Sequence, residues 1–143
     1  MRHSRTAGIC TAALALAATV ILSLPSSAIA GTRVCTSRSG VGKTCIRSEK
    51  DPTLNVWYFH MTYTNESNAP QHVTIYLYRD AQPDRLKAQS QPDYDQPGQT
   101  TGWDYSITPN GLPCGEPFYA DGKTYKDGAT SFQEVFSPET ISC

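Results

Sequence analysis

Two histidines, His60 and His72, are the side chains best suited to acid–base chemistry near neutral pH, since the third, His3, lies at the very start of the chain. A hydrolytic site would pair one of them with an activated nucleophile, but the sequence contains no Gly-x-Ser-x-Gly elbow. It also lacks the His-x-x-x-His spacing of a zinc site. We therefore expect a protein that is not an enzyme and that has no catalytic residue, metal or cofactor.

The N-terminus has the pattern of a secretion signal. Arg2 and Arg5 precede the uncharged apolar run Ile9–Leu24, and Ala28–Ala30 forms a small-x-small cleavage sequence. The apolar run is shorter than the ~20 residues that a membrane-spanning helix needs. We expect residues 1–30 to be a signal peptide, and residues 31–143 to be a single secreted domain without a membrane partner.

The cysteines fit this interpretation. Cleavage would remove Cys10 and leave Cys35, Cys45, Cys114 and Cys143. Thiols oxidise outside the cytosol, and small exported domains depend on such crosslinks. Cys35 and Cys45 flank a Ser/Gly-rich turn, so a local hairpin disulfide is predicted there, which leaves Cys114 to pair with Cys143. Four cysteines allow three pairings, so this connectivity is a preference.

Two further patterns resemble ligand sites without meeting their requirements. Residues 37–44 come close to a phosphate-binding loop, but cysteines flank them and no helix is predicted to follow. Asp93, Asp95 and Asp104 echo a calcium loop, yet Pro97 occupies a ligand position and Asp104 is shorter than the usual glutamate. An ordinary turn is the simpler interpretation of each.

Charge is divided unevenly along the chain. Residues 31–50 carry five basic side chains and one acidic one, whereas residues 51–143 carry five basic and twelve acidic ones. A basic arm could meet a polyanion, but a hairpin that lies against its own acidic body explains the same charges. Because aromatic residues are not interleaved with the basic ones, we expect no nucleic-acid partner.

The strongest structural signal is a pair of alternating segments, Asn55–Thr64 and Gln71–Arg79, predicted as the strands of one hairpin around the turn Asn65–Ala69. Pairing Trp57 with Leu77 puts the strongly apolar residues of both strands on one side, which we predict to be core. The other side is the candidate protein-binding face. It comprises Tyr58, His60, His72, Tyr76 and Tyr78. In this register His60 and His72 are diagonal neighbours with Cβ atoms roughly 7–8 Å apart, which is marginal for one metal ion.

The remaining chain is also rich in β-formers and turns. Residues 81–101 read as a long loop, Trp103, Tyr105 and Ile107 alternate as a strand, and Asp121-Gly122 reads as a two-residue hairpin turn. Ser131–Phe136 is a further strand. The predicted fold is all-β, a small disulfide-braced β-sandwich of immunoglobulin-like type, with a small β-barrel as the alternative.

The run from Trp57 to Pro70, followed by His72–Ile75, resembles the strand–turn–strand unit of immunoglobulin-like extracellular sandwiches. The layout of the whole chain resembles small exported actinobacterial proteins that act by binding, namely hydrolase inhibitors and the adaptor subunits of umbrella-type toxin particles. The resemblance implies a non-catalytic module whose partner is another protein. An inhibitor would present a rigid loop such as Asn110–Pro117, and an adaptor a sheet face or edge.

A carbohydrate or cell-wall binding module is the alternative from another class. It would use Trp103 and Tyr105 as stacking platforms. Because these two residues alternate with Asp104, we expect them to face the core instead. A small secreted hydrolase is a more remote alternative.

Overall fold

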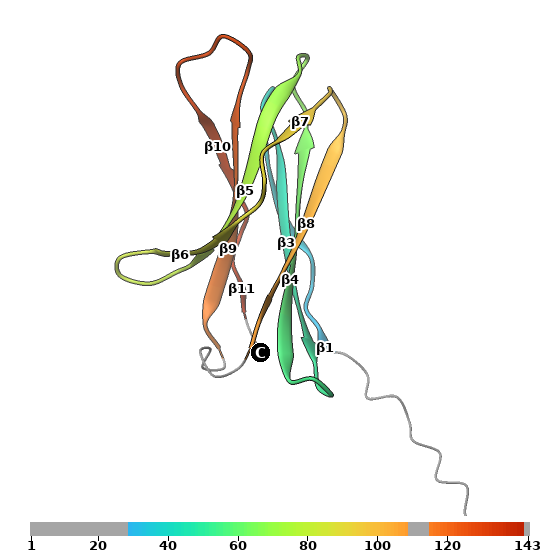
Figure 1. The fold of residues 1–143 in the computed structure, drawn as a ribbon, viewed down its shortest axis with the longest axis vertical. Helices are drawn as coiled ribbons and strands as arrows, with labels where there is room; N and C mark the ends of the chain where they lie inside the picture. The colour runs from blue at the N-terminus through green and yellow to red at the C-terminus, as the bar shows by residue number, and fades with distance from the viewer. Residues whose placement is uncertain (1–28, 109–114, 142–143) are drawn as a thin grey trace, which may run out of the picture.

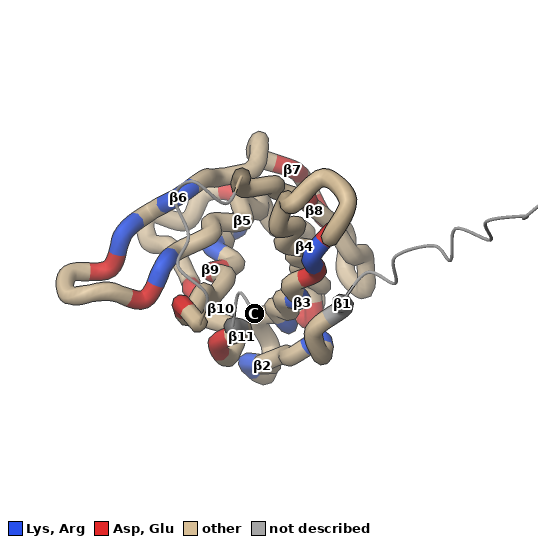
Figure 2. Tube along the Cα trace, turned by 90° about the horizontal axis from the view of Figure 1, so that it is seen from below, with Lys and Arg blue, Asp and Glu red and all other residues tan. Residues whose placement is uncertain are grey.

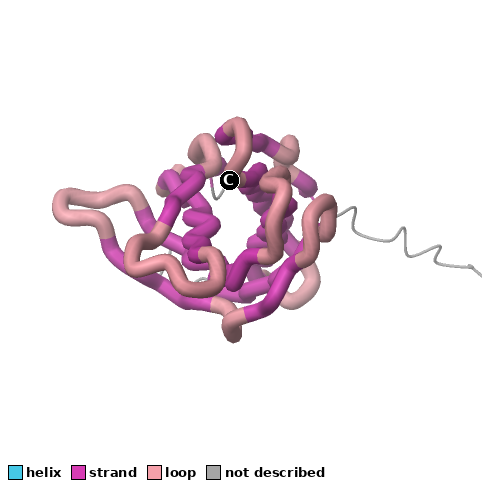
Figure 3. The backbone as a smooth tube through the Cα atoms, turned by 90° about the horizontal axis from the view of Figure 1, so that it is seen from above, coloured by secondary structure: helices cyan, strands magenta, loops and turns pink. Residues whose placement is uncertain are grey.

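In a computed structural model, which describes residues 29–108 and 115–141, two antiparallel sheets face each other (Figure 1). The first sheet has the order β1 (Ile29–Ala30), β3 (Gly42–Asp51), β4 (Val56–Asn65) and β8 (Thr100–Ile107), with β2 (Val34–Arg38) also paired to β3. The second has the order β10 (Gln133–Phe136), β9 (Pro117–Tyr125), β5 (Gln71–Arg79) and β6 (Arg85–Gln89), with β11 (Thr140–Ile141) on β9 and β7 (Asp93–Asp95) on β5. Viewed from above, the described residues form strands and loops only (Figure 3). The predicted all-β sandwich is confirmed.

The predicted Cys35–Cys45 disulfide is confirmed, and it joins β2 and β3. The two cysteines are directly opposite each other in the ladder. Gly40 supplies the left-handed backbone of the connecting turn, with φ of 70°. The crosslink therefore ties neighbouring strands of one sheet, whereas the disulfide of antibody domains joins the two sheets. Cys114 and Cys143 lie outside the described residues.

The predicted hairpin between β4 and β5 is wrong, because the two strands belong to different sheets. β4 pairs with β3 and β8, whereas β5 pairs with β9, β6 and β7. The connection is anchored by Asn65, whose side-chain amide donates to the carbonyl of Ala69 at 2.9 Å and to that of Asp95 at 3.0 Å. These bonds hold the chain where it crosses from one sheet to the other.

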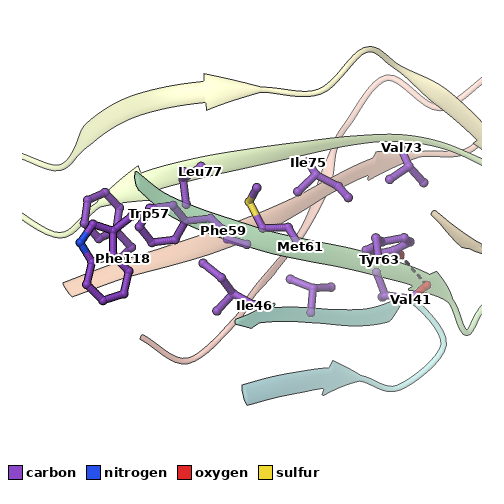
Figure 4. Close-up of a cluster of buried hydrophobic side chains, with 12 residues drawn as sticks. Val41, Ile46, Trp57, Phe59, Met61, Tyr63, Val73, Ile75, Leu77 and Phe118 are labelled. Atoms are coloured by element: carbon purple, nitrogen blue, oxygen red, sulfur yellow. Dashed lines mark hydrogen bonds between the residues drawn. The ribbon is translucent and has the colours of Figure 1, made fainter. Parts of the chain in front are cut away.

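The core prediction is confirmed even though the pairing is not. The apolar residues of β4 and β5 are buried between the sheets and meet across the sandwich (Figure 4). Phe59 of β4 contacts Phe118 of β9, with ring centroids 4.6 Å apart. Period-two alternation specifies which side chains point inward, and both arrangements put the same residues there. Trp103 and Tyr105 are partly buried and pack against this core, as predicted.

The predicted turn at Asp121-Gly122 is also wrong, since β9 runs through it without a break. A Cβ atom at Gly122 would lie 2.4 Å from Cδ2 of Tyr63 and 2.5 Å from Oγ1 of Thr44. Tyr63 is fully buried, and its hydroxyl lies 2.9 Å from the carbonyl of Val41. Gly122 is therefore required for the close approach of this ring, rather than for a turn.

The segment 81–101, predicted as a loop, contains strands β6 and β7 and the start of β8. The β5–β6 hairpin projects from the body of the sandwich and bears both acidic and basic residues (Figures 1 and 2). Ser90, which follows β6, donates its backbone amide to the carbonyl of Ile75 at 2.8 Å. Polar contacts of this kind hold in place a segment that has few apolar side chains to bury.

Most of the predicted signal peptide lies outside the described residues, but its last two residues form β1 and pair with Lys50 and Glu49. The backbone amide of Gly31 donates to the carbonyl of Ser48 at 2.7 Å. Cleavage after Ala30 would remove β1 and make Gly31 the first residue. In the part of the chain that is described, no helix is long and apolar enough to cross a membrane.

Candidate protein-binding face

The five residues predicted to form one binding face lie on two. Tyr58 and His60 project from the outer surface of β4 in the first sheet. His72, Tyr76 and Tyr78 project from the outer surface of β5 in the second sheet. This correction follows from the placement of β4 and β5 in opposite sheets. It also separates the two histidines that had been expected to be diagonal neighbours.

The outer surface of the second sheet gathers more aromatic residues than β5 alone supplies. We call this surface the aromatic face and define it by residues of five strands and of the loop before β10. Its members are His72, Tyr76, Tyr78, Leu86, Tyr94, Tyr119, Tyr125, Phe132 and Phe136. They lie on one side because side chains paired across antiparallel strands point the same way.

At one end of the aromatic face, rings from three adjacent strands form a continuous row. Tyr78 of β5 stacks on Tyr119 of β9, with centroids 5.3 Å apart and planes at 15°. Tyr119 meets Phe136 of β10 edge-on at 5.9 Å, and Tyr76 stacks on Tyr78 at 6.3 Å. Burial raises the pKa of Tyr119, and its hydrogen bond to Asp84 raises it further. Burial also raises the pKa of Tyr78, so the hydroxyls of Tyr78 and Tyr119 stay protonated at neutral pH.

At the other end, an exposed aspartate holds three elements together. Asp127, which follows β9, accepts hydrogen bonds from the Tyr94 hydroxyl at 3.0 Å and approaches His72 Nε2 at 2.7 Å. The contact with His72, and then that with Tyr94, lowers the pKa of Asp127. His72 also stacks on Tyr125, with centroids 4.6 Å apart. Hydrogen bonds and stacking thus fix the orientation of the aromatic side chains at this end.

Between these two ends lies a small charged group. Lys123 Nζ is 3.1 Å from a Glu134 oxygen and lies 4.7 Å from the ring centroid of Phe132. Asp121 is only 2% exposed, and one of its carboxyl oxygens has no hydrogen-bond partner among the described residues. Burial, followed by repulsion from Glu134, raises the pKa of Asp121 to about 6. A carboxyl group is thus buried on the outer side of a sheet, between Tyr76 and Phe136 on the neighbouring strands.

The aromatic face is also where apolar surface remains open. Six large hydrophobic side chains are exposed in the described part of the chain, and five belong to this face. Phe132 is 61% exposed and Phe136 48%. Phe136 and Tyr119 line a cleft of about 380 Å³ together with Glu139. Sequence reasoning missed the contribution of β9, although Tyr119, Lys123 and Tyr125 alternate with period two, because Asp121-Gly122 was interpreted as a turn.

Among the residues that the structure describes, no group of three His, Cys, Asp or Glu side chains is placed to hold a metal ion. Asp93 and Asp95, the acids of the calcium-like pattern, are instead bridged by the Thr101 hydroxyl, at 2.9 and 2.6 Å. Burial raises the pKa of Asp95. This segment therefore uses its carboxylates to fasten β7 to β8.

No protein family model matches the chain, and no curated protein matches it. Among solved structures, the crystal structure of a Bordetella pertussis protein provisionally assigned as ApaA matches with 14% sequence identity and a TM-score of 0.46. The match covers 80% of this chain and 89% of the other.

Proposed function

We propose that this chain is a secreted, non-catalytic module that binds another protein through the aromatic face. The observation that carries the proposal is the concentration of exposed apolar side chains there, five of the six in the described residues. Contiguous apolar patches on soluble domains mark interaction sites, and tyrosine and phenylalanine are enriched at the centre of interfaces. Secretion is supported by the N-terminal signal pattern and by the Cys35–Cys45 disulfide.

The face favours a role as an assembly adaptor over that of a loop-type inhibitor. Its rings are stacked on one another and tied to neighbouring strands, so little side-chain freedom remains to be lost on binding. A sheet face of this kind fits a broad partner surface. The loop expected for an inhibitor, Asn110–Pro117, lies mostly outside the described residues.

The test compares the mature chain, residues 31–143, with a variant carrying Phe132→Ser and Phe136→Ser. Each protein is immobilised and exposed to culture fluid of the producing organism, and the captured protein is identified and titrated. Losing aromatic anchors costs about 2 kcal/mol, so we expect the variant to bind roughly thirtyfold more weakly.

Leu54→Ser is the matched control, because Leu54 is 63% exposed in the turn between β3 and β4, away from the aromatic face. It removes a comparable apolar side chain and should leave affinity unchanged. Equal capture by all three proteins would place the interface elsewhere. Turnover of a substrate by the purified chain would contradict the non-catalytic assignment.

A further inference from the structure

A second site lies on the outer surface of the first sheet, on the opposite side of the sandwich from the aromatic face. Arg33, Arg47, His60 and Thr62 line a pocket of about 180 Å³ there. They come from three places in the chain, namely the segment before β2, strand β3 and strand β4. Arg47 is directly opposite His60 in the ladder, and Arg33 donates a hydrogen bond to the Thr62 hydroxyl at 2.5 Å.

The lining is rich in hydrogen-bond donors. Arg47 uses one terminal nitrogen to bind Glu49 at 3.1 Å, whereas its Nε is buried and has no hydrogen-bond partner among the described residues. A guanidinium carries five N–H donors in a planar fork, which suits oxygen anions. The terminal N–H groups of the two arginines, rather than the buried Nε, are the donors that can reach an anionic oxygen in the pocket.

Two carboxylates support the site without lining it. Asp104 of β8 lies 2.8 Å from Nδ1 of His60, and Glu49 lies 3.6 Å from its Nε2. They orient the imidazole and the Arg47 side chain, as carboxylates commonly do behind a ligand-binding side chain. Their negative charge also limits how tightly the pocket can hold an anion.

We propose that this pocket binds one oxyanion group, a carboxylate, sulfate or phosphate, of a ligand. Two guanidinium groups, an imidazole and a hydroxyl converge on a space suited to one such group rather than to a chain of them. The basic character of residues 31–50 adds attraction at longer range. The proposal is independent of the aromatic face and holds whether or not that face binds a protein.

The experiment titrates the isotope-labelled mature chain with sodium phosphate, sulfate or acetate at constant ionic strength, with chloride as the reference. The NMR signals followed are those of the arginine Nε–H groups and of the His60 imidazole. We expect saturable changes of the Arg47 and His60 signals. The binding that they report should be at least tenfold tighter for one oxyanion than for chloride. Preference for phosphate or sulfate over acetate would identify a tetrahedral ligand group, and the reverse a carboxylate.

Single substitutions test whether this pocket is the site of oxyanion binding. Arg33→Gln and Arg47→Gln should each weaken binding at least tenfold. Arg38→Gln should leave it unchanged, because Arg38 belongs to the same basic hairpin but hydrogen bonds to the Glu134 carbonyl instead. Glu49→Gln should strengthen binding about fivefold by removing a nearby negative charge. Shifts that do not saturate, equal losses in Arg38→Gln, or weaker binding by Glu49→Gln would overturn the proposal.

Discussion

Replacing Asp121 by asparagine should remove a pH-dependent loss of stability. Asp121 lies on the outer side of β9 and is 2% exposed, and its burial raises the pKa from 3.8 to about 6. The folded protein therefore binds this proton more tightly than the unfolded chain does. Between about pH 4 and pH 6 the folded state carries more of the proton, so the free energy of unfolding falls as pH rises through this interval.

The size of the effect follows from the shift. A difference of about two pKa units corresponds to about 3 kcal/mol, which is lost in full once the pH exceeds about 6. That is a large part of the stability of a small domain, about 5–15 kcal/mol. Asparagine has a similar shape and remains neutral at every pH, so the variant lacks this component.

Urea unfolding of the wild type and Asp121→Asn at about pH 4, 5, 6 and 7.5 measures the difference directly. Other carboxyl groups with displaced pKa values, such as Asp95 and Asp127, titrate equally in both proteins and cancel. The stability of the variant relative to the wild type should rise by about 3 kcal/mol from pH 4 to pH 7.5. A difference that stays constant to within about 0.5 kcal/mol would refute the reasoning.

Two further changes test the fold. Gly122→Ala should destabilise the protein by about 1–3 kcal/mol, because its Cβ would lie 2.4 Å from the Tyr63 ring. Gly102→Ala, whose nearest contact would be 3.8 Å away, should destabilise it far less. Thermal unfolding compares the two variants, and equal effects would contradict this account. Replacing Cys35 and Cys45 together by serine should lower the free energy of unfolding by about 3 kcal/mol, because the crosslink closes a loop over a separation of 10 residues. Denaturant unfolding measures that loss, and an unchanged midpoint would show that the crosslink adds no stability.

Much of the fold could be predicted from local pattern. The alternation in β4 and β5 identified the inward side chains, and the Ser/Gly turn identified the Cys35–Cys45 hairpin. Strand partners could not be predicted in this way, because alternation specifies a side chain's direction and not its neighbour. The turn signal of Asp121-Gly122 failed because packing against Tyr63 imposes a stronger requirement for glycine at that position.

The candidate site was predicted only in part for the same reason. Tyr76 and Tyr78 were identified, but the rings that complete their row, Tyr119 and Phe136, come from strands much later in the chain. His60 was assigned to the wrong surface and belongs instead with Arg33 and Arg47. Sites assembled from several strands of one sheet carry no short motif, so their members can be identified only once the strand order is known.

The crossing of the chain between sheets after β4 also governs how the molecule can assemble. Each sheet includes a strand that pairs with a partner far earlier in the sequence. In the first sheet β8 pairs with β4, and the contacting residues His60 and Asp104 are 44 residues apart. In the second sheet β9 pairs with β5. Non-local pairings of this kind slow folding, because the entropy of closing long loops is spent before the contacts form. A chain that stops before Pro117 would leave β5 without β9, and Phe59 of β4 without its core contact, Phe118. The hydrophobic core is therefore complete only after the strands near the C-terminus have joined the second sheet.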